Sequence, residues 1–218
     1  MSTAKPVEGN KYKHAFHFDN ADHEYESSKQ GVWLFMSTEV LMFGGLLVAY
    51  LIFKGLYPES FRAGGDTLSW QFGAFNTIVL IFSSLTMALG IYYIRLNERS
   101  KALWSLGITL VCGAIFMGVK YIEYTSKFEL GIYPGHLFAM EGVNDPHLNL
   151  YFSFYYMLTG LHGLHVLIGM GLIAWIMVRI KNGWYSSQHW TGVEGVGIFW
   201  HLVDLVWIYL FPLLYLVE

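Results

Sequence analysis

Five long apolar stretches constrain this chain of 218 residues more than any other feature. A helix that crosses a bilayer needs about 20 consecutive, mostly apolar residues, and five such helices would take up about half of the chain. We therefore predict an all-α membrane protein, a bundle of five transmembrane helices within residues 31–218 that follows a polar tail at residues 1–30. The five expected spans are residues 31–53, 72–94, 102–124, 150–178 and 196–217.

The composition agrees with a membrane protein and argues against several other classes. Charged residues make up 13% of the chain, against about 25% in soluble domains. With 13 Lys and Arg against 16 Asp and Glu, the net charge is −3, and no basic field exists for nucleic acid. A single cysteine, Cys112, excludes a disulfide framework and a cysteine-based zinc site.

The distribution of Lys and Arg predicts the orientation of the bundle. Nine of them fall on the side of the tail and of the second and fourth loops, and four, including Lys120, fall on the other side. Cytoplasmic loops of membrane proteins carry the excess of positive charge. We therefore expect a cytoplasmic N-terminus and, after five spans, a periplasmic C-terminus.

Ionisable residues inside the spans are costly in a bilayer and are functional candidates by default. Glu39 falls about eight residues into the first expected span, ~12 Å below the cytoplasmic edge. Because a low dielectric disfavours a carboxylate, Glu39 is either a proton-handling acid or a protonated acid that donates one hydrogen bond to a neighbouring helix. Glu123 is a further candidate, closer to the membrane surface.

Four candidates form two pairs with the spacing i, i+3. His162 and His165 share one helix face near mid-membrane, where hydrogen bonding to adjacent helices or to a lipid headgroup is favoured over metal binding. Their spacing differs from the usual i, i+4 of helical metal ligands, and no third ligand is near. In the fifth span, the carboxylate of Asp204 could hydrogen-bond to the imidazole of His201, and a structural contact is favoured over catalysis.

Arg179 ends the fourth span, where it either marks the cytoplasmic boundary or clamps a lipid phosphate with its guanidinium. The chain has no phosphate-cradling loop, no nucleophile elbow, no haem-attachment cysteine pair and no set of residues with the ligand count of a copper site. These features favour an accessory or scaffold subunit over a self-sufficient enzyme.

Three segments resemble subunit III of the haem-copper terminal oxidases in its five-helix form. Residues 159–169, TGLHGLHVLIG, match the family pattern T-G-x-H-G-x-H-V-x-x-G. Residues 200–207, WHLVDLVW, match W-H-F-V-D-V-V-W with conservative changes, and residues 35–43 look like the family's segment with a buried glutamate. With weaker matches in the second and third spans, the resemblance covers about residues 30–217 in order. One departure is Lys120, where the family often has glutamine.

The resemblance implies a non-redox subunit of a proton-pumping oxidase that reduces oxygen to water in an aerobic respiratory chain. It implies contact with oxidase subunit I above all, and with subunit II and other small subunits, as a complex that can join a respiratory supercomplex. It also implies no cofactor in this chain, haem and copper in the partner subunits, bound phospholipid, and support of proton uptake. By position, Glu39 matches a buried glutamate beside the lipid cleft, and His165 and Arg179 match positions close to a lipid headgroup. The five-helix form with a polar tail indicates a bacterial plasma membrane.

Other functions stay open at this point. An accessory protein of a nitric oxide reductase that is similar to subunit III would have much the same sequence. A proton-coupled transporter or a haem-binding membrane electron carrier would instead use Glu39, Asp204 and the histidines to line a pathway or to ligate haem.

Overall fold

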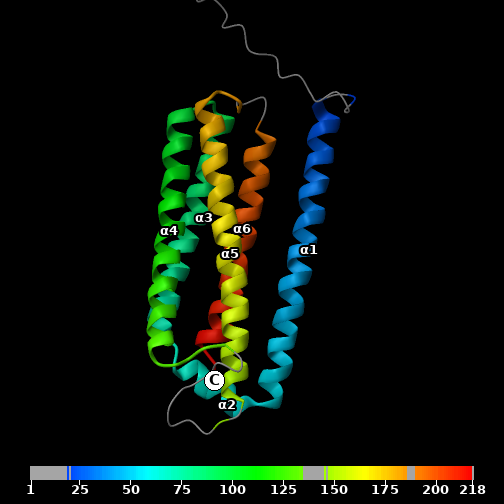
Figure 1. The fold of residues 1–218 in the computed structure, drawn as a ribbon. Helices are drawn as coiled ribbons and strands as arrows, with labels where there is room; N and C mark the ends of the chain where they lie inside the picture. Colours follow the sequence, from blue (N-terminus) through cyan, green and yellow to red (C-terminus); the bar gives the residue numbers. More distant parts are fainter. Residues whose placement is uncertain (1–18, 20, 135–144, 146, 186–189, 218) are drawn as a thin grey trace, which may run out of the picture.

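The computed structural model describes residues 19, 21–134, 145, 147–185 and 190–217, and these form six α-helices (Figure 1). Their bounds are α1 Ala21–Leu56, α2 Pro58–Asp66, α3 Trp70–Arg95, α4 Arg99–Glu129, α5 Leu148–Lys181 and α6 Thr191–Tyr215. Five of the six are long and apolar enough to cross a membrane. In hydrocarbon a helix satisfies all of its own backbone hydrogen bonds, which is why each apolar stretch becomes one.

The predicted all-α class is confirmed, and five helices that are long and apolar enough to span a membrane lie at the five predicted stretches. Most of their ends lie beyond the predicted ones, but α6 ends at Tyr215, two residues before the predicted end. The largest difference is in α1, which begins at Ala21 and so includes the last ten residues of the predicted tail. Glu39 therefore lies near the middle of α1, about 27 Å from its start, rather than close to one edge. The remainder of the predicted tail, residues 1–18 and 20, lies outside the described residues.

The short helix α2 was missed because its nine residues carry no membrane signal. It begins with Pro58 at its first turn, a position where proline costs no helical hydrogen bond. Its buried residues include Phe61 and Gly64, which pack against Tyr151 of α5. The helix thereby closes one end of the bundle beneath α5 and α6 (Figure 1).

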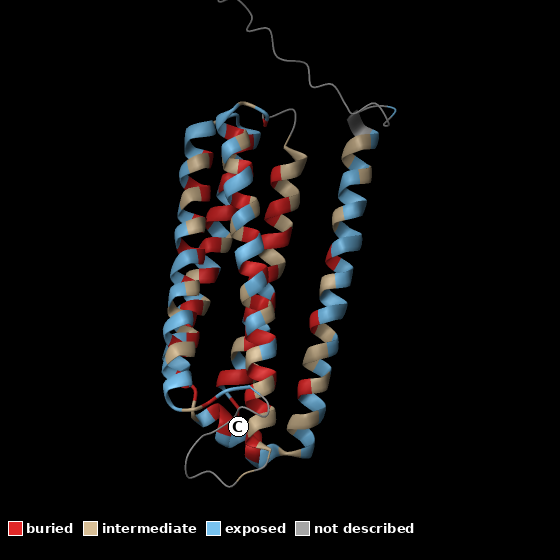
Figure 2. Ribbon diagram, in the orientation of Figure 1, coloured by how far each residue is buried: buried red, intermediate tan, exposed pale blue. Residues whose placement is uncertain are grey.

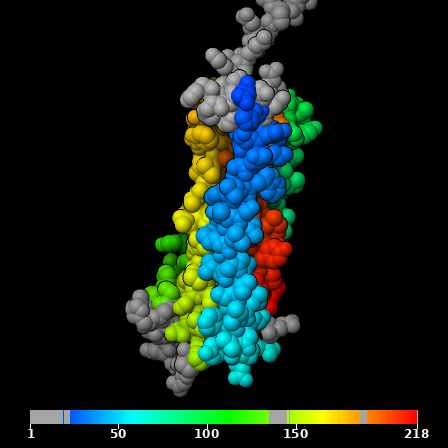
Figure 3. Space-filling view, turned by 90° about the vertical axis from the view of Figure 1, so that its right-hand side faces the viewer, coloured from blue at the N-terminus to red at the C-terminus, as the bar shows by residue number. Residues whose placement is uncertain are grey.

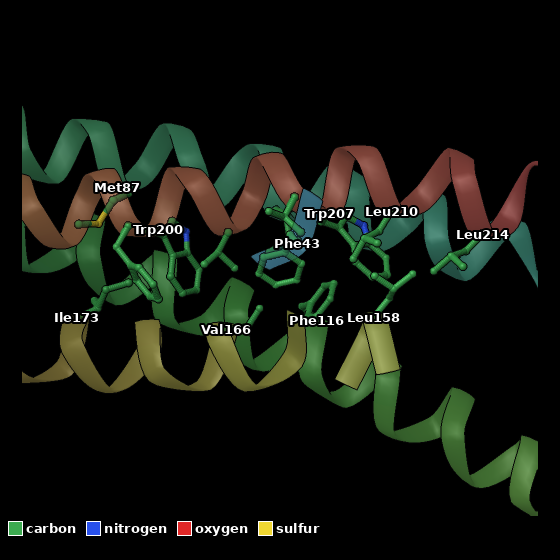
Figure 4. Close-up of a cluster of buried hydrophobic side chains, with 14 of the residues drawn as sticks. Phe43, Met87, Phe116, Leu158, Val166, Ile173, Trp200, Trp207, Leu210 and Leu214 are labelled. Carbon is green, nitrogen blue, oxygen red and sulfur yellow. The ribbon is translucent and has the colours of Figure 1, made fainter. Parts of the chain in front are cut away.

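Helices α3 to α6 form a closed four-helix bundle in which each helix runs opposite to the next (Figure 1). Their buried residues face one another, and the outward faces are exposed, as Figure 2 shows. Trp200 and Trp207 of α6 occupy the centre of the core, with Phe116 of α4 against Trp207 at a centroid distance of 4.8 Å (Figure 4). Large aromatic side chains thus fill the space between the four helices.

Helix α1 stands beside this bundle and touches it along a narrow seam. In Figure 3 it lies across the front between α5 and α6. The most buried residues of its central part are Met36, Phe43 and Tyr50, which are seven residues apart. With Val32, Glu39, Leu46 and Phe53 between and beside them, they follow the 3–4 spacing of a single packed stripe. Most of the remaining described residues of α1 are exposed, as expected for a helix that has lipid or another protein on most sides.

Basic residues gather at the end of the bundle where α1 begins, here called the upper end after Figure 1. The described ones there are Lys29, Arg95, Arg99, Lys101, Arg179 and Lys181. At the opposite, lower end lie Lys54, Arg62 and Lys127. Lys120 belongs to neither group, because its side chain is buried within the bundle. Among the described residues, the basic side chains at the upper end thus outnumber those at the lower end, in the same sense as the sequence count.

Two glycines of α5 give a matched test of this packing. A Cβ atom on Gly169 would lie 2.8 Å from Cε3 of the buried Trp200, whereas one on Gly171 would meet nothing within 4 Å. We expect Gly169→Ala to lower stability by about 1–3 kcal/mol, because the indole has no space to move. Gly171→Ala is the control and should leave stability unchanged or slightly raised. The measurement is thermal unfolding of the purified protein in mild detergent, and equal midpoints for the two variants would contradict the packing.

Candidate functional site

Glu39 of α1 and His165 of α5 form a pair near the middle of the membrane. Oε2 of Glu39 lies 2.9 Å from Nε2 of His165, and both side chains are about nine-tenths buried. Nδ1 of His165 lies 2.7 Å from the carbonyl oxygen of Leu161, which can only accept a hydrogen bond. Nδ1 therefore carries a proton and donates it to this carbonyl.

This arrangement determines the charge of the pair. Nε2 either accepts a hydrogen bond from a protonated Glu39 or, as part of an imidazolium, donates one to the carboxylate. In both states one proton lies between Oε2 and Nε2, and the total charge of the two side chains is zero. The pair is thus compatible with hydrocarbon, and it joins α1 to α5. The sequence singled out both residues but did not predict that they meet.

Two further polar contacts hold α1 against the bundle. Near the upper end, the Tyr25 hydroxyl donates to Oε2 of Glu194 over 3.3 Å. Near the lower end, the Tyr50 hydroxyl donates to the Leu213 carbonyl over 2.6 Å. Together with the Glu39–His165 pair, these contacts give α1 three polar contacts with the bundle, spaced along its narrow apolar seam. Neither tyrosine was a candidate, because Tyr25 falls in the predicted tail and only ionisable residues such as Glu39 were sought within the spans.

The predicted histidine face divides in two. His165 points toward α1, where Phe43 packs edge-on against its ring at 5.2 Å. His162 is fully buried between Phe116, at 5.4 Å, and Trp207, at 5.2 Å. Neither ring nitrogen of His162 makes a hydrogen bond within the described part of the chain, so the expected bond to a helix or headgroup is not found for it. His162 acts as a packing residue of the core.

Lys120 and Glu123 form a buried ion pair that the sequence did not reveal. Nζ of Lys120 lies 2.8 Å from Oε2 of Glu123, and both side chains are more than nine-tenths buried. Nζ also donates to the hydroxyls of Tyr155, over 3.1 Å, and Tyr215, over 2.8 Å. The Tyr215 hydroxyl in turn donates to Glu123. The cluster joins α4, α5 and α6, and the indole of Trp207 lies 5.3 Å from Nζ.

The expected contact between His201 and Asp204 is not formed. Nδ1 of His201 instead lies 2.7 Å from the Ser84 hydroxyl of α3. Asp204 is buried beside Ser83 and Ser84, and neither carboxyl oxygen makes a hydrogen bond within the described residues. Both side chains thus face α3, and His201 bonds to a serine of that helix instead of to Asp204.

Arg179 lies at the upper end between two indoles. Its guanidinium is 4.5 Å from the Trp175 ring and 4.8 Å from the Trp184 ring. Because its donors lie in the plane of the group, stacking on its faces leaves the edges for an anion. Arg179 follows His165 by 14 residues of helix, which is about 21 Å. One lipid headgroup therefore cannot contact both residues.

A cleft of about 650 Å³ lies between α1, α5 and α6 at the upper end. Its apolar wall includes Phe35, Ile168 and Phe199, and its polar residues include Lys29 and Glu194. It is apolar toward the membrane interior and polar toward the membrane surface. Within the described residues, no group of three or more His, Cys, Asp or Glu side chains could hold a metal ion.

These features define a class: a multi-pass membrane protein whose described part holds two pairs of ionisable groups, Glu39 with His165 and Lys120 with Glu123, inside the helix bundle. Comparison with known proteins gives the family. The family model described as cytochrome c oxidase subunit III matches residues 20–218. The chain belongs to the cytochrome c oxidase subunit III family.

Similar proteins carry two kinds of name. Cytochrome c oxidase subunit 3 of Thermostichus vulcanus is 35% identical over 91% of this chain and 91% of its own length. The protein of the same name from Synechocystis sp. is 37% identical over 85% of this chain and 74% of its own length. Probable quinol oxidase subunit 3 of Staphylococcus aureus is 27% identical over 91% of this chain and 93% of its own length.

The Lys120 cluster gives a test with a matched control on the same helix. Lys120→Met should lower stability by about 3–5 kcal/mol, because Glu123 is left as an unpaired buried charge. The double variant Lys120→Met, Glu123→Leu should recover much of that loss. The control is Lys101→Met, whose partner Glu98 is at a similar 2.6 Å but exposed, and it should cost less than about 1 kcal/mol. Thermal unfolding of the purified protein measures all three, and a double variant as unstable as Lys120→Met would contradict the interpretation.

Proposed function

We propose that this chain is the non-redox subunit of a proton-pumping haem-copper terminal oxidase that stabilises subunit I, holds phospholipid and supports proton uptake. The observation that carries the proposal is the closed Glu39–His165 pair in a chain of this family. Because this acid is neutralised by a partner beside the cleft, it fits a supporting role better than a step of a continuous proton path. Haem and copper belong to the partner subunits, and the chain itself does not catalyse the reaction.

The names of the relatives support a position for this chain in the complex that is away from the site where the electron donor binds. Some relatives are named as subunits of cytochrome c oxidases and others as subunits of quinol oxidases. A subunit that occurs in both kinds is best placed where it does not contact the electron donor. We propose contacts with subunit I above all, and with subunit II and smaller subunits.

Orientation and location complete the proposal. The upper end carries most of the Lys and Arg, which favours a cytoplasmic N-terminus and a periplasmic C-terminus. The organisms of the similar proteins support a bacterial membrane, and we propose the plasma membrane. The cleft then opens near the cytoplasmic surface.

The experiment that tests this proposal is purification of the complex from membranes in mild detergent. A large subunit with stoichiometric haem and copper should co-purify with this chain. A visible spectrum separates the alternatives: a haem Soret band from this chain alone would favour an electron carrier. Recovery of the chain without any haem protein would favour a transporter, and nitric oxide reductase activity in the complex would favour the accessory protein.

Removing either member of the membrane pair gives a prediction about turnover. Glu39→Ala and His165→Ala should each leave the initial rate of oxygen reduction close to wild type, because neither residue contacts a reacting group. Each should shorten the active lifetime of the complex severalfold, since α1 loses its central polar contact with the bundle and the remaining partner is unpaired. Oxygen consumption followed over many turnovers is the measurement. Loss of the first turnovers would instead place the pair in the catalytic path.

Neighbouring residues of α5 test lipid binding in the cleft. Ile168 lines the cleft and Leu167 does not, and both side chains are about half exposed. Ile168→Trp should fill part of the cleft and remove about one tightly held phospholipid per complex, because the indole takes the volume of acyl chain segments. Leu167→Trp is the control and should retain it. Mass spectrometry of lipids extracted from the purified complex measures the difference, and equal retention by the two variants would contradict the assignment.

A further inference from the structure

A second concave surface lies on the far side of α6 from α1, between α3 and α6. It is a groove of about 400 Å³ whose polar residues are Ser84, His201 and Asp204. Its apolar lining is Ile81, Leu85, Ala88, Leu205 and Ile208. Helix α1 packs on α2, α5 and α6 and makes no contact with α3, so it does not cover this groove. The groove is therefore separate from the cleft described above.

His201 presents one ring nitrogen to this groove. Its Nδ1 is held 2.7 Å from the Ser84 hydroxyl, which fixes the orientation of the ring. Its Nε2 makes no hydrogen bond within the described residues. Unlike both nitrogens of His162, Nε2 is not sealed within the core, because the side chain is only half-buried. A polar atom is thus fixed in place and open toward the outside of the bundle.

The depth of this nitrogen limits what can satisfy it. His201 comes ten residues after the start of α6, about 15 Å along the helix, and 14 residues before its end, about 21 Å. That position lies near the middle of a hydrocarbon core about 30 Å thick. A lipid headgroup does not reach this depth, and an acyl chain has no hydrogen-bonding atom. An imidazole open to hydrocarbon is costly, so a protein group is the appropriate partner.

We propose that the groove between α3 and α6 is the docking site for a transmembrane helix of a partner subunit, which places a hydrogen-bonding side chain against Nε2 of His201. The inference rests on the proposed function, in which this chain assembles with larger oxidase subunits. Ser84 and Ala88, one turn apart on α3, are small and permit close approach of a second helix. The exposed leucine and isoleucine side chains of the rim supply the packing surface.

Site-directed photocross-linking in the assembled complex tests the surface directly. A photoreactive phenylalanine replaces Leu205 in the groove or, as the control, Val111 on the outer face of α4, and the two residues are about equally exposed. The Leu205 position should cross-link to a partner subunit, and the Val111 position should do so far less. Cross-links from Leu205 to lipid alone, or to a second copy of this chain, would overturn the proposal, as would protein cross-links from Val111 alone.

Variants of His201 test the hydrogen bond. His201→Leu should weaken retention of this chain in the complex by roughly three- to ten-fold, the loss expected for one interhelical hydrogen bond in a membrane. His201→Gln, which keeps a polar group of similar reach, should restore part of the retention. The readout is the fraction of this chain bound to the large subunit across a detergent series. Retention equal to wild type in His201→Leu would overturn the role of His201.

The two proposals fail in different ways. If no large subunit co-purifies with the wild-type chain, the proposed function is wrong and the docking site is wrong with it. If the complex is intact but the Leu205 position cross-links only to lipid, the proposed function stands and the docking site alone is wrong. To exclude a folding defect, the His201 variants are compared with wild type in thermal unfolding of the free chain. Because His201→Leu also loses the internal bond to Ser84, its transition should stay cooperative with a midpoint only slightly below that of wild type.

Discussion

The structure depends on the absence of hydrogen-bonding solvent in the hydrocarbon core of a membrane. A charge buried within the bundle must likewise find its partner inside the protein, and Lys120 and Glu123 do so with two tyrosine hydroxyls. Because Tyr155 and Tyr215 come from α5 and α6, satisfying one lysine of α4 fixes three helices relative to one another. Burying such a pair adds little to net stability, but it strongly disfavours arrangements in which the partners are apart.

The same constraint explains what the sequence could predict. The five spans follow from length and hydropathy, which are local properties, and so does the list of buried candidates. Which candidates meet is not a local property: Glu39 and His165 are 126 residues apart, and only the packing of α1 on α5 brings them together.

The i, i+3 spacing was an unreliable guide, since it marks a real ion pair at Lys120 and Glu123 but no bond between His201 and Asp204. Lys120 was counted as a loop charge because it lies close to the end of an expected span. Its spacing from Glu123 within an apolar helix was the signal that could have placed it in the core.

The two concave surfaces differ in the chemistry they offer. The cleft between α1, α5 and α6 is polar at the membrane surface and apolar deeper, which matches an amphipathic lipid. The groove between α3 and α6 is apolar at its rim and polar at the centre of the membrane, which matches a helix that carries one polar side chain. The motif at residues 200–207 serves both the interior and this outer surface. Its two tryptophans donate to Ser83 and Thr77 of α3, while His201 turns outward.

The three polar contacts of α1 also bear on the order in which the helices pack during biosynthesis. Helix α1 precedes the other described spans along the chain, yet its partners His165, Glu194 and Leu213 belong to α5 and α6. Until α5 and α6 follow, the partners that the structure shows for Glu39, Tyr25 and Tyr50 are not yet in the membrane. Docking of α1 along its length therefore waits for the insertion of these two helices. A chain truncated before α5 would leave α1 without His165, the partner of its buried acid.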